Sequence, residues 1–145
     1  MQNKFVGLLT LLCMVFVFAT PHLNAANSCS TWPVAQPQPA GAPNIPANIQ
    51  AIPGNEEVEL HWGEASGADG YYVVWTDCSQ SKVDDIFDLD WQQATTNSST
   101  VDDLINGQAY QFVVISFAGS GPGATISTES DVIQATPGDP TTTIP

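Results

Sequence analysis

The segment LHWGEASGADGYYVVWTDC at residues 60–78 holds two short apolar runs on either side of a glycine-containing break. In the first run, Val58, Leu60 and Trp62 alternate with Glu59 and His61. Such alternation is typical of a strand with one buried face, because successive side chains of a strand point to opposite faces. The pattern predicts a strand that places Trp62 in a core and His61 toward solvent.

Short apolar segments of this kind recur along the chain, with turn residues between them and no helical period of useful length. We expect strands at residues 48–52, 57–62, 71–76, 91–95, 99–101, 109–117 and 129–135. Seven short strands at roughly even spacing indicate an all-β, seven-stranded immunoglobulin-like sandwich.

The motifs within these segments make the prediction more specific. Residues 58–62 read V-x-L-x-W, residues 67–73 read GADGYYV, residues 104–114 read L-x-x-G-x-x-Y-x-F-x-V, and residues 135–137 read ATP. In this order and spacing, residues 46–137 resemble a fibronectin type III domain. Residues 78–90 depart from the family pattern by a longer, acidic connection.

The resemblance implies which residues form the core and where one corner lies. Leu104 and Tyr110 correspond to the corner before the sixth strand of the family. A buried tyrosine also needs a partner for its hydroxyl, which a corner with exposed backbone groups supplies. The expected core residues are Trp62, Tyr71, Val73, Leu104, Tyr110 and Phe112.

The segments outside residues 46–137 do not read as parts of the sandwich. Residues 1–26 carry Lys4 as their only charge, an apolar run, and small residues before Asn27, which is typical of a secretory signal peptide. Residues 27–45 are rich in proline and read as an extended linker or tail. Residues 138–145 read as a disordered tail. We expect a secreted, extracellular or periplasmic protein.

The charge of the chain is strongly one-sided. Removal of residues 1–26 would leave Lys82 as the only Lys or Arg against 15 Asp and Glu, a formal charge of −14. Nucleic acid and anionic lipid need Lys and Arg to neutralise their phosphates, so we expect neither as a direct partner. We also expect no membrane insertion after cleavage of the signal, and the acidic surface is typical of a protein kept apart by self-repulsion.

Cleavage would leave Cys29 and Cys78 as the remaining cysteines. An exported chain meets an oxidising compartment, so a Cys29–Cys78 disulfide is the natural expectation. Free or intermolecular thiols are the alternatives. Lipidation at Cys29 is a further one, which a small residue just before it favours and the absence of the usual leucine disfavours.

The sequence offers little for catalysis or for a cofactor. The mature chain has one histidine, His61, beside Glu59 on a predicted strand face, and no motif supplies a nucleophile. We therefore expect no enzyme and no cofactor. The acidic residues of the 78–90 connection are weak candidates for calcium, because the loop lacks the glycine and closing glutamate of an EF-hand. They are Asp84, Asp85, Asp88 and Asp90.

One surface remains as a candidate for binding. If Tyr71 and Tyr110 point inward, alternation sends the residues between the inward ones to the outer face of the same sheet. These residues are Tyr72, Val74, Val113, Ile115 and Phe117. They predict an apolar patch, which either binds a partner or is covered by Ile86, Phe87 and Leu89 of the long connection or by Trp32 of the tail.

These observations predict a non-catalytic module that acts as a binding or spacer domain. A protein that assembles with itself or with an envelope component through the apolar patch is one alternative. A carbohydrate-binding accessory module is another, with exposed aromatic residues such as Trp91 as stacking platforms. A linear arrangement of exposed rings would favour it.

Overall fold

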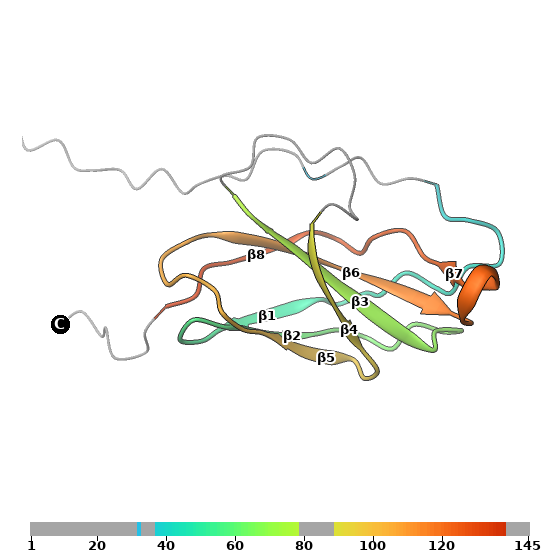
Figure 1. The fold of residues 1–145 in the computed structure, drawn as a ribbon, viewed down its shortest axis with the longest axis horizontal. Helices are drawn as coiled ribbons and strands as arrows, with labels where there is room; N and C mark the ends of the chain where they lie inside the picture. The colour runs from blue at the N-terminus through green and yellow to red at the C-terminus, as the bar shows by residue number, and fades with distance from the viewer. Residues whose placement is uncertain (1–31, 33–36, 79–88, 139–145) are drawn as a thin grey trace, which may run out of the picture.

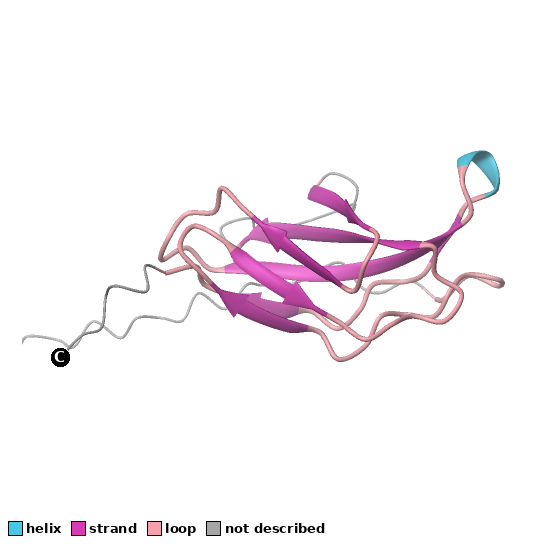
Figure 2. Ribbon diagram, turned by 90° about the horizontal axis from the view of Figure 1, so that it is seen from below, coloured by secondary structure: helices cyan, strands magenta, loops and turns pink. Residues whose placement is uncertain are grey.

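The computed structural model describes residue 32, residues 37–78 and residues 89–138. Two antiparallel sheets pack as the layers of a sandwich (Figures 1 and 2). The smaller sheet has the strand order β1-β2-β5, and the larger has the order β4-β3-β6-β7, with β8 also paired to β6. The strands are β1 (Gln50–Pro53), β2 (Val58–His61), β3 (Gly70–Asp77), β4 (Asp90–Ala94), β5 (Ser98–Val101), β6 (Tyr110–Ala118), β7 (Thr125–Ile126) and β8 (Ile133–Ala135).

The core lies between the sheets and follows the alternation of the strands. In β2, Val58 and Leu60 are fully buried while Glu59 is exposed. Trp62 follows directly and contacts Tyr71 of β3 edge-on, with ring centroids 5.3 Å apart. The six residues assigned to the core from the sequence all belong to this buried cluster: Trp62, Tyr71, Val73, Leu104, Tyr110 and Phe112.

Two core tyrosines bind the backbone through their hydroxyl groups. The Tyr110 hydroxyl accepts a hydrogen bond from the backbone N–H of Ile105 at 3.1 Å, which places a corner before β6. The Tyr71 hydroxyl accepts one from the buried N–H of Ala65 at 3.0 Å. Each bond gives a partner to a buried phenol and to a backbone donor of a connecting segment.

The last predicted strand differs from the observed one. Residues 129–135 were expected to form one strand, but only Ile133–Ala135 (β8) pairs with β6. The two-residue strand β7, which precedes the predicted strand, pairs with the end of β6. Between these strands the hydroxyl of Ser127 accepts from the N–H of Ser116, and that of Ser130 accepts from the N–H of Val114. The backbone N–H groups of the same two serines donate to the carbonyls of Ser116 and Val114, so serine hydroxyls replace only the backbone acceptors along this edge of β6.

Part of the predicted linker packs on the sandwich. The Gln38 side chain accepts hydrogen bonds from the backbone N–H and the hydroxyl of Thr128 and donates one to the carbonyl of Pro43. The Ser116 hydroxyl donates to the carbonyl of Asn44 at 2.6 Å. Residues 37–45 therefore interact with β6 and with the segment after β7.

The described chain enters and leaves the sandwich at opposite ends. In Figure 1 the segment before β1, in cyan, lies at the right end together with the short 3-10 turn η2 (Gly121–Gly123), and the segment after β8 lies at the left end. No helix in the described residues is long and apolar enough to cross a bilayer.

Candidate interaction surface

The strand register brings the five predicted surface residues onto the outer face of the larger sheet. Val74 lies directly opposite Val113, and Tyr72 lies opposite Ile115, across the β3–β6 pair. Phe117 is the register partner of Gly70 on the same face. Alternation along β3 and β6 therefore gave the correct face for these side chains.

Their exposure differs from the expectation of an accessible patch. Val74, Val113 and Ile115, which we call the covered face, are 4%, 0% and 3% exposed. Leu89, Trp32 and Ile126 belong to the same buried cluster. The prediction of an open partner surface is thus wrong for the covered face, because other segments of the chain bury it.

Two of the four residues that the sequence offered as a cover for this face do cover it. Leu89 of the long connection and Trp32 of the N-terminal segment both pack in the cluster of the covered face. Ile86 and Phe87, which were also expected to cover it, lie outside the described residues. The indole Nε1 of Trp32 is buried and has no hydrogen-bond partner in the part of the chain that the structure describes, so apolar contacts hold Trp32 against the covered face.

Three aromatic rings lie in a row across the same face. Trp91 of β4 contacts Tyr72 of β3 edge-on, with ring centroids 5.5 Å apart, and Tyr72 contacts Phe117 of β6 at 4.8 Å. We call Trp91, Tyr72 and Phe117 the aromatic row. Tyr72 and Phe117 are partly buried, while Trp91 is 55% exposed.

Trp91 lies on an edge strand of the larger sheet. In the described part of the chain, β4 pairs with β3 and is the terminal strand of the sheet. Trp91 is the register partner of Val74 and therefore points to the outer face. Gln93 is the partner of Tyr72 and points the same way, whereas Asp90 and Gln92 point to the inner side.

A hollow of about 600 Å³ lies on the inner side of β4. We call it the acidic hollow, because four aspartates contribute to its wall. The sequence did not predict it, since its residues come from β3, β4, the β5–β6 connection and the start of β6. Its lining residues are Trp75, Thr76, Asp77, Leu89, Asp90, Gln92, Asp102, Asp103, Leu104 and Tyr110.

Gln92 joins the edge strands of the two sheets beside this hollow. Its side-chain Nε2 donates to the hydroxyl of Ser99 and to the carbonyl of Thr100, both at 2.7 Å. Because Ser99 and Thr100 belong to β5, the bridge fixes the position of β4 relative to the smaller sheet.

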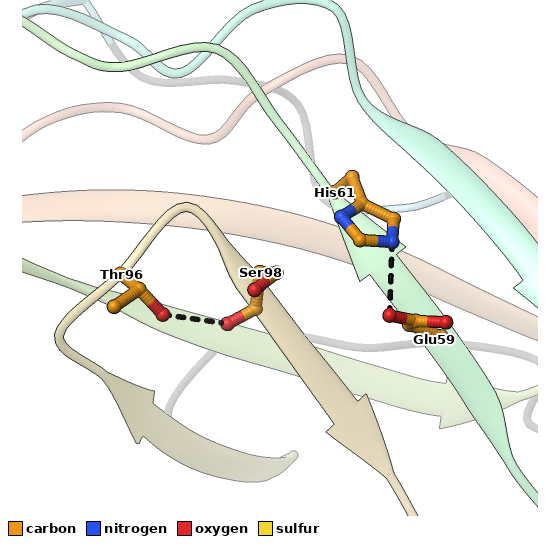
Figure 3. A network of polar contacts seen from close by, with 4 residues as sticks. All are labelled: Glu59, His61, Thr96 and Ser98. Carbon is orange, nitrogen blue, oxygen red and sulfur yellow. Dashed lines mark hydrogen bonds and ion pairs between the residues drawn. The ribbon is translucent and has the colours of Figure 1, made fainter.

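The His61–Glu59 pair has the form of a base and its orienting carboxylate. His61 Nε2 lies 3.0 Å from Glu59 Oε1, and the two side chains are 42% and 49% exposed (Figure 3). Ser98 on β5 is the register partner of His61, yet the hydrogen bond drawn at this serine runs from the Thr96 hydroxyl to its backbone carbonyl. Among the described residues, no hydrogen bond joins the Ser98 hydroxyl to His61, and the pair is a solvent-facing contact on a strand.

Most of the predicted metal-binding residues lie outside the described part of the chain. Asp84, Asp85 and Asp88 are not described, and Asp90 is exposed at the start of β4. Within residues 37–78 and 89–138, no group of three His, Cys, Asp or Glu side chains is placed to hold a metal ion. Calcium binding at the four aspartates stays a prediction.

Of the two cysteines expected to form a disulfide, the structure describes Cys78 and not Cys29. Cys78 follows β3 and is not free in the structure. Its predicted partner Cys29 lies outside the described residues, as do residues 1–26 and the tail after Gly138. The Cys29–Cys78 bond, the lipidation alternative and the signal peptide stay predictions.

Comparison with known proteins supports the fold. No family model matches the chain, and no curated protein matches it. A solved myokine structure is similar over 66% of this chain and 98% of its own, with 20% identity and a TM-score of 0.50. The FN1–FN3 domains of chicken CNTN1 are similar over 67% of this chain, with 16% identity and a TM-score of 0.55.

The share of each solved structure that the chain covers differs. The chain spans 32% of the CNTN1 fragment and almost all of the myokine structure. The predicted all-β fold is confirmed, and it is the fold of a fibronectin type III domain. The fold alone does not fix a function, which depends on the site that the chain carries.

Proposed function

We propose that this chain is an exported, non-catalytic binding module of the fibronectin type III fold, and that its contact surface is the free edge of β4 with Trp91. The proposal combines the predicted signal peptide with the fold and with the exposure of one aromatic side chain. It assigns the rest of the outer sheet face to internal packing.

The exposed and supported position of Trp91 carries the proposal. Singly exposed apolar residues are normal on protein surfaces, and Ile105, at 68%, is one of them. Trp91 differs in three ways: Tyr72 supports its ring, no other described strand pairs with the outer edge of β4, and the acidic hollow lies on the opposite side of that strand. Tryptophans held in this way are enriched among residues that dominate binding energy.

Self-assembly through the apolar face receives less support. Val74 and Val113 would have to be accessible, and both are buried under other residues of the chain. A formal charge of −14 after signal cleavage would also make two copies repel each other at low salt.

A carbohydrate-binding role would be supported by a row of well-exposed rings. The aromatic row has the required linear arrangement, but Tyr72 and Phe117 are partly buried and Trp91 is its one exposed residue. A single accessible ring beside a free strand edge fits a polypeptide partner better, because the edge supplies backbone hydrogen-bonding groups.

A spacer role fits the entry and exit of the chain at opposite ends of the sandwich (Figure 1). It would need no accessible aromatic residue, so Trp91 is the residue that separates a binding role from a pure spacer role.

Site-specific photo-crosslinking in cells of the source organism tests the proposal. The full chain would carry a photoreactive phenylalanine analogue in place of Trp91 or, as a matched control, in place of Ile52, which is exposed on β1 of the smaller sheet. Crosslinked species from position 91 and none from position 52 are expected. Absence of crosslinks at both positions would contradict the binding role, and mass spectrometry of the same material would show whether residues 1–26 are removed.

A further inference from the structure

We propose that the partner contributes an extended, basic peptide segment, which pairs with the free edge of β4 as an added strand. This inference rests on the proposed function and specifies its partner. It follows from three features that meet at β4: an unpaired strand edge, an aromatic residue on the outer side of the strand, and carboxylates on its inner side.

The strand edge supplies the main-chain part of the site. Among the described residues, β4 pairs with β3 only, so the backbone N–H and C=O groups along its other side are available. An exposed edge of this kind is a template for a further strand. In such complexes, backbone hydrogen bonds provide affinity, and the alternating side chains of the peptide provide specificity.

The two sides of β4 differ in chemistry. Trp91 and Gln93 lie on the outer side, where they would meet every second side chain of an added strand. Asp90 and Gln92 lie on the inner side next to the acidic hollow, to which Asp102 and Asp103 also contribute. An added strand would therefore direct its remaining side chains toward carboxylates.

Charge selects the class of peptide. Among its described lining residues the hollow has carboxylates and no lysine or arginine, so this wall favours ammonium and guanidinium groups and repels acidic ones. The described carboxylates are not grouped to hold a single metal ion. Carboxylates spread along a hollow suit several basic side chains, which a peptide with lysine or arginine at alternate positions provides.

The edge is held in place before a partner arrives. Gln92 ties β4 to β5 through its hydrogen bonds to Ser99 and Thr100, and Trp91 rests against Tyr72. A preformed edge lowers the ordering cost that binding must overcome. On binding, the peptide would become ordered while β4 keeps its conformation.

Isothermal titration calorimetry with a synthetic peptide tests this inference. The probe is a peptide of about eight residues in which lysine alternates with valine, long enough to span the five residues of β4. Saturable binding to the full chain is expected, with an affinity that falls as salt rises. A peptide with glutamate in place of lysine should not bind.

Variants of the chain locate the site. Trp91→Ala and the double variant Asp102→Asn, Asp103→Asn should each weaken binding about tenfold or more. Ile52→Ala is the matched control, because Ile52 is 51% exposed on β1, at the edge of the smaller sheet that lies opposite β5, and this variant should bind as the unmodified chain does. Equal binding by all these variants would overturn the inference.

A modified peptide separates strand pairing from simple charge attraction. Methylation of alternate backbone nitrogens on the edge-facing side removes donors and keeps the charge, so it should abolish binding if an added strand forms. Unchanged binding of the methylated peptide would contradict the inference. Binding of a neutral oligosaccharide at Trp91 in place of the peptide would contradict the inference as well, and would leave the proposed binding role of Trp91 intact.

Discussion

Gly70 leaves the space that the Phe117 ring occupies on the outer face. A Cβ atom at residue 70 would lie 2.6 Å from Cζ of Phe117 and 3.0 Å from the backbone carbonyl oxygen of Ala94. The ring is held against Tyr72, and the carbonyl belongs to β4, so neither can move freely. The position of one ring of the aromatic row thus depends on the absence of a side chain.

Gly70→Ala is therefore expected to lower the free energy of unfolding by about 1–3 kcal/mol, the usual range for overpacking. Gly123→Ala is the matched control, because no atom lies within 4 Å of a Cβ placed there. Denaturant unfolding followed by fluorescence measures both. Equal stability of the two variants would show that the Phe117 ring is free to move aside.

The hydroxyl groups of the tyrosines on β3 differ in role although the residues are adjacent. The Tyr71 hydroxyl accepts a hydrogen bond from the buried N–H of Ala65, whereas the Tyr72 ring contacts Trp91 and Phe117 on the opposite face of the sheet. Tyr71→Phe should lower the free energy of unfolding by about 1–3 kcal/mol, because it leaves a buried donor without a partner.

Tyr72→Phe is the control for Tyr71→Phe, since it keeps the ring contacts and should change stability by less than about 0.5 kcal/mol. The same denaturant measurement compares them. A larger loss in Tyr72→Phe than in Tyr71→Phe would contradict the assignment of inward and outward faces along β3.

At the level of elements, the middle of β6 is buried on both faces. Phe112 and Val114 face the core between the sheets, while Val113 and Ile115 face the cover that includes Trp32 and Leu89. Removal of the cover should therefore expose apolar surface of β6 without opening the main core.

Trp32→Ala is expected to lower the free energy of unfolding by about 1–3 kcal/mol and to increase binding of a hydrophobic dye, because the covered face becomes accessible. Trp32→Phe should keep most of the cover and remove the unpartnered indole N–H, so its loss should be smaller. Dye fluorescence and denaturant unfolding report the two effects. Equal behaviour of Trp32→Ala and the unmodified chain would show that Trp32 does not stabilise the cover.

The sequence predicted the strands from β1 to β6 because the alternation of apolar and polar residues follows burial, but it missed β7 and made the last strand too long. It placed Trp62, Tyr71 and Phe112 correctly between the sheets. Alternation shows which side chains point to the outer face of a sheet, but not whether another segment covers that face. The sequence therefore left two alternatives for Val113, an open binding surface or burial by residues such as Trp32 and Leu89, and the structure shows burial. The acidic hollow escaped prediction because Asp90 and Asp102 come together only through the packing of β4 beside the β5–β6 connection.

At the level of the whole molecule, the charge and the cover both oppose self-association. We expect a monomer by light scattering of residues 27–145 at low salt. The double variant Val74→Ser, Val113→Ser should also be a monomer but should unfold more easily, because it places hydroxyl groups among buried apolar side chains. A dimer that the double variant converts into a monomer would restore the apolar face as an assembly surface.

The most direct test of the covered face and the open β4 edge is solvent paramagnetic relaxation by NMR, with a soluble gadolinium chelate added to the full chain. We predict strong relaxation of the Trp91 indole N–H and weak relaxation of the Val74 and Val113 methyl groups, with the valines becoming accessible in Trp32→Ala. Strong relaxation of Val113 in the unmodified chain, or protection of Trp91, would contradict the assignment of the binding surface.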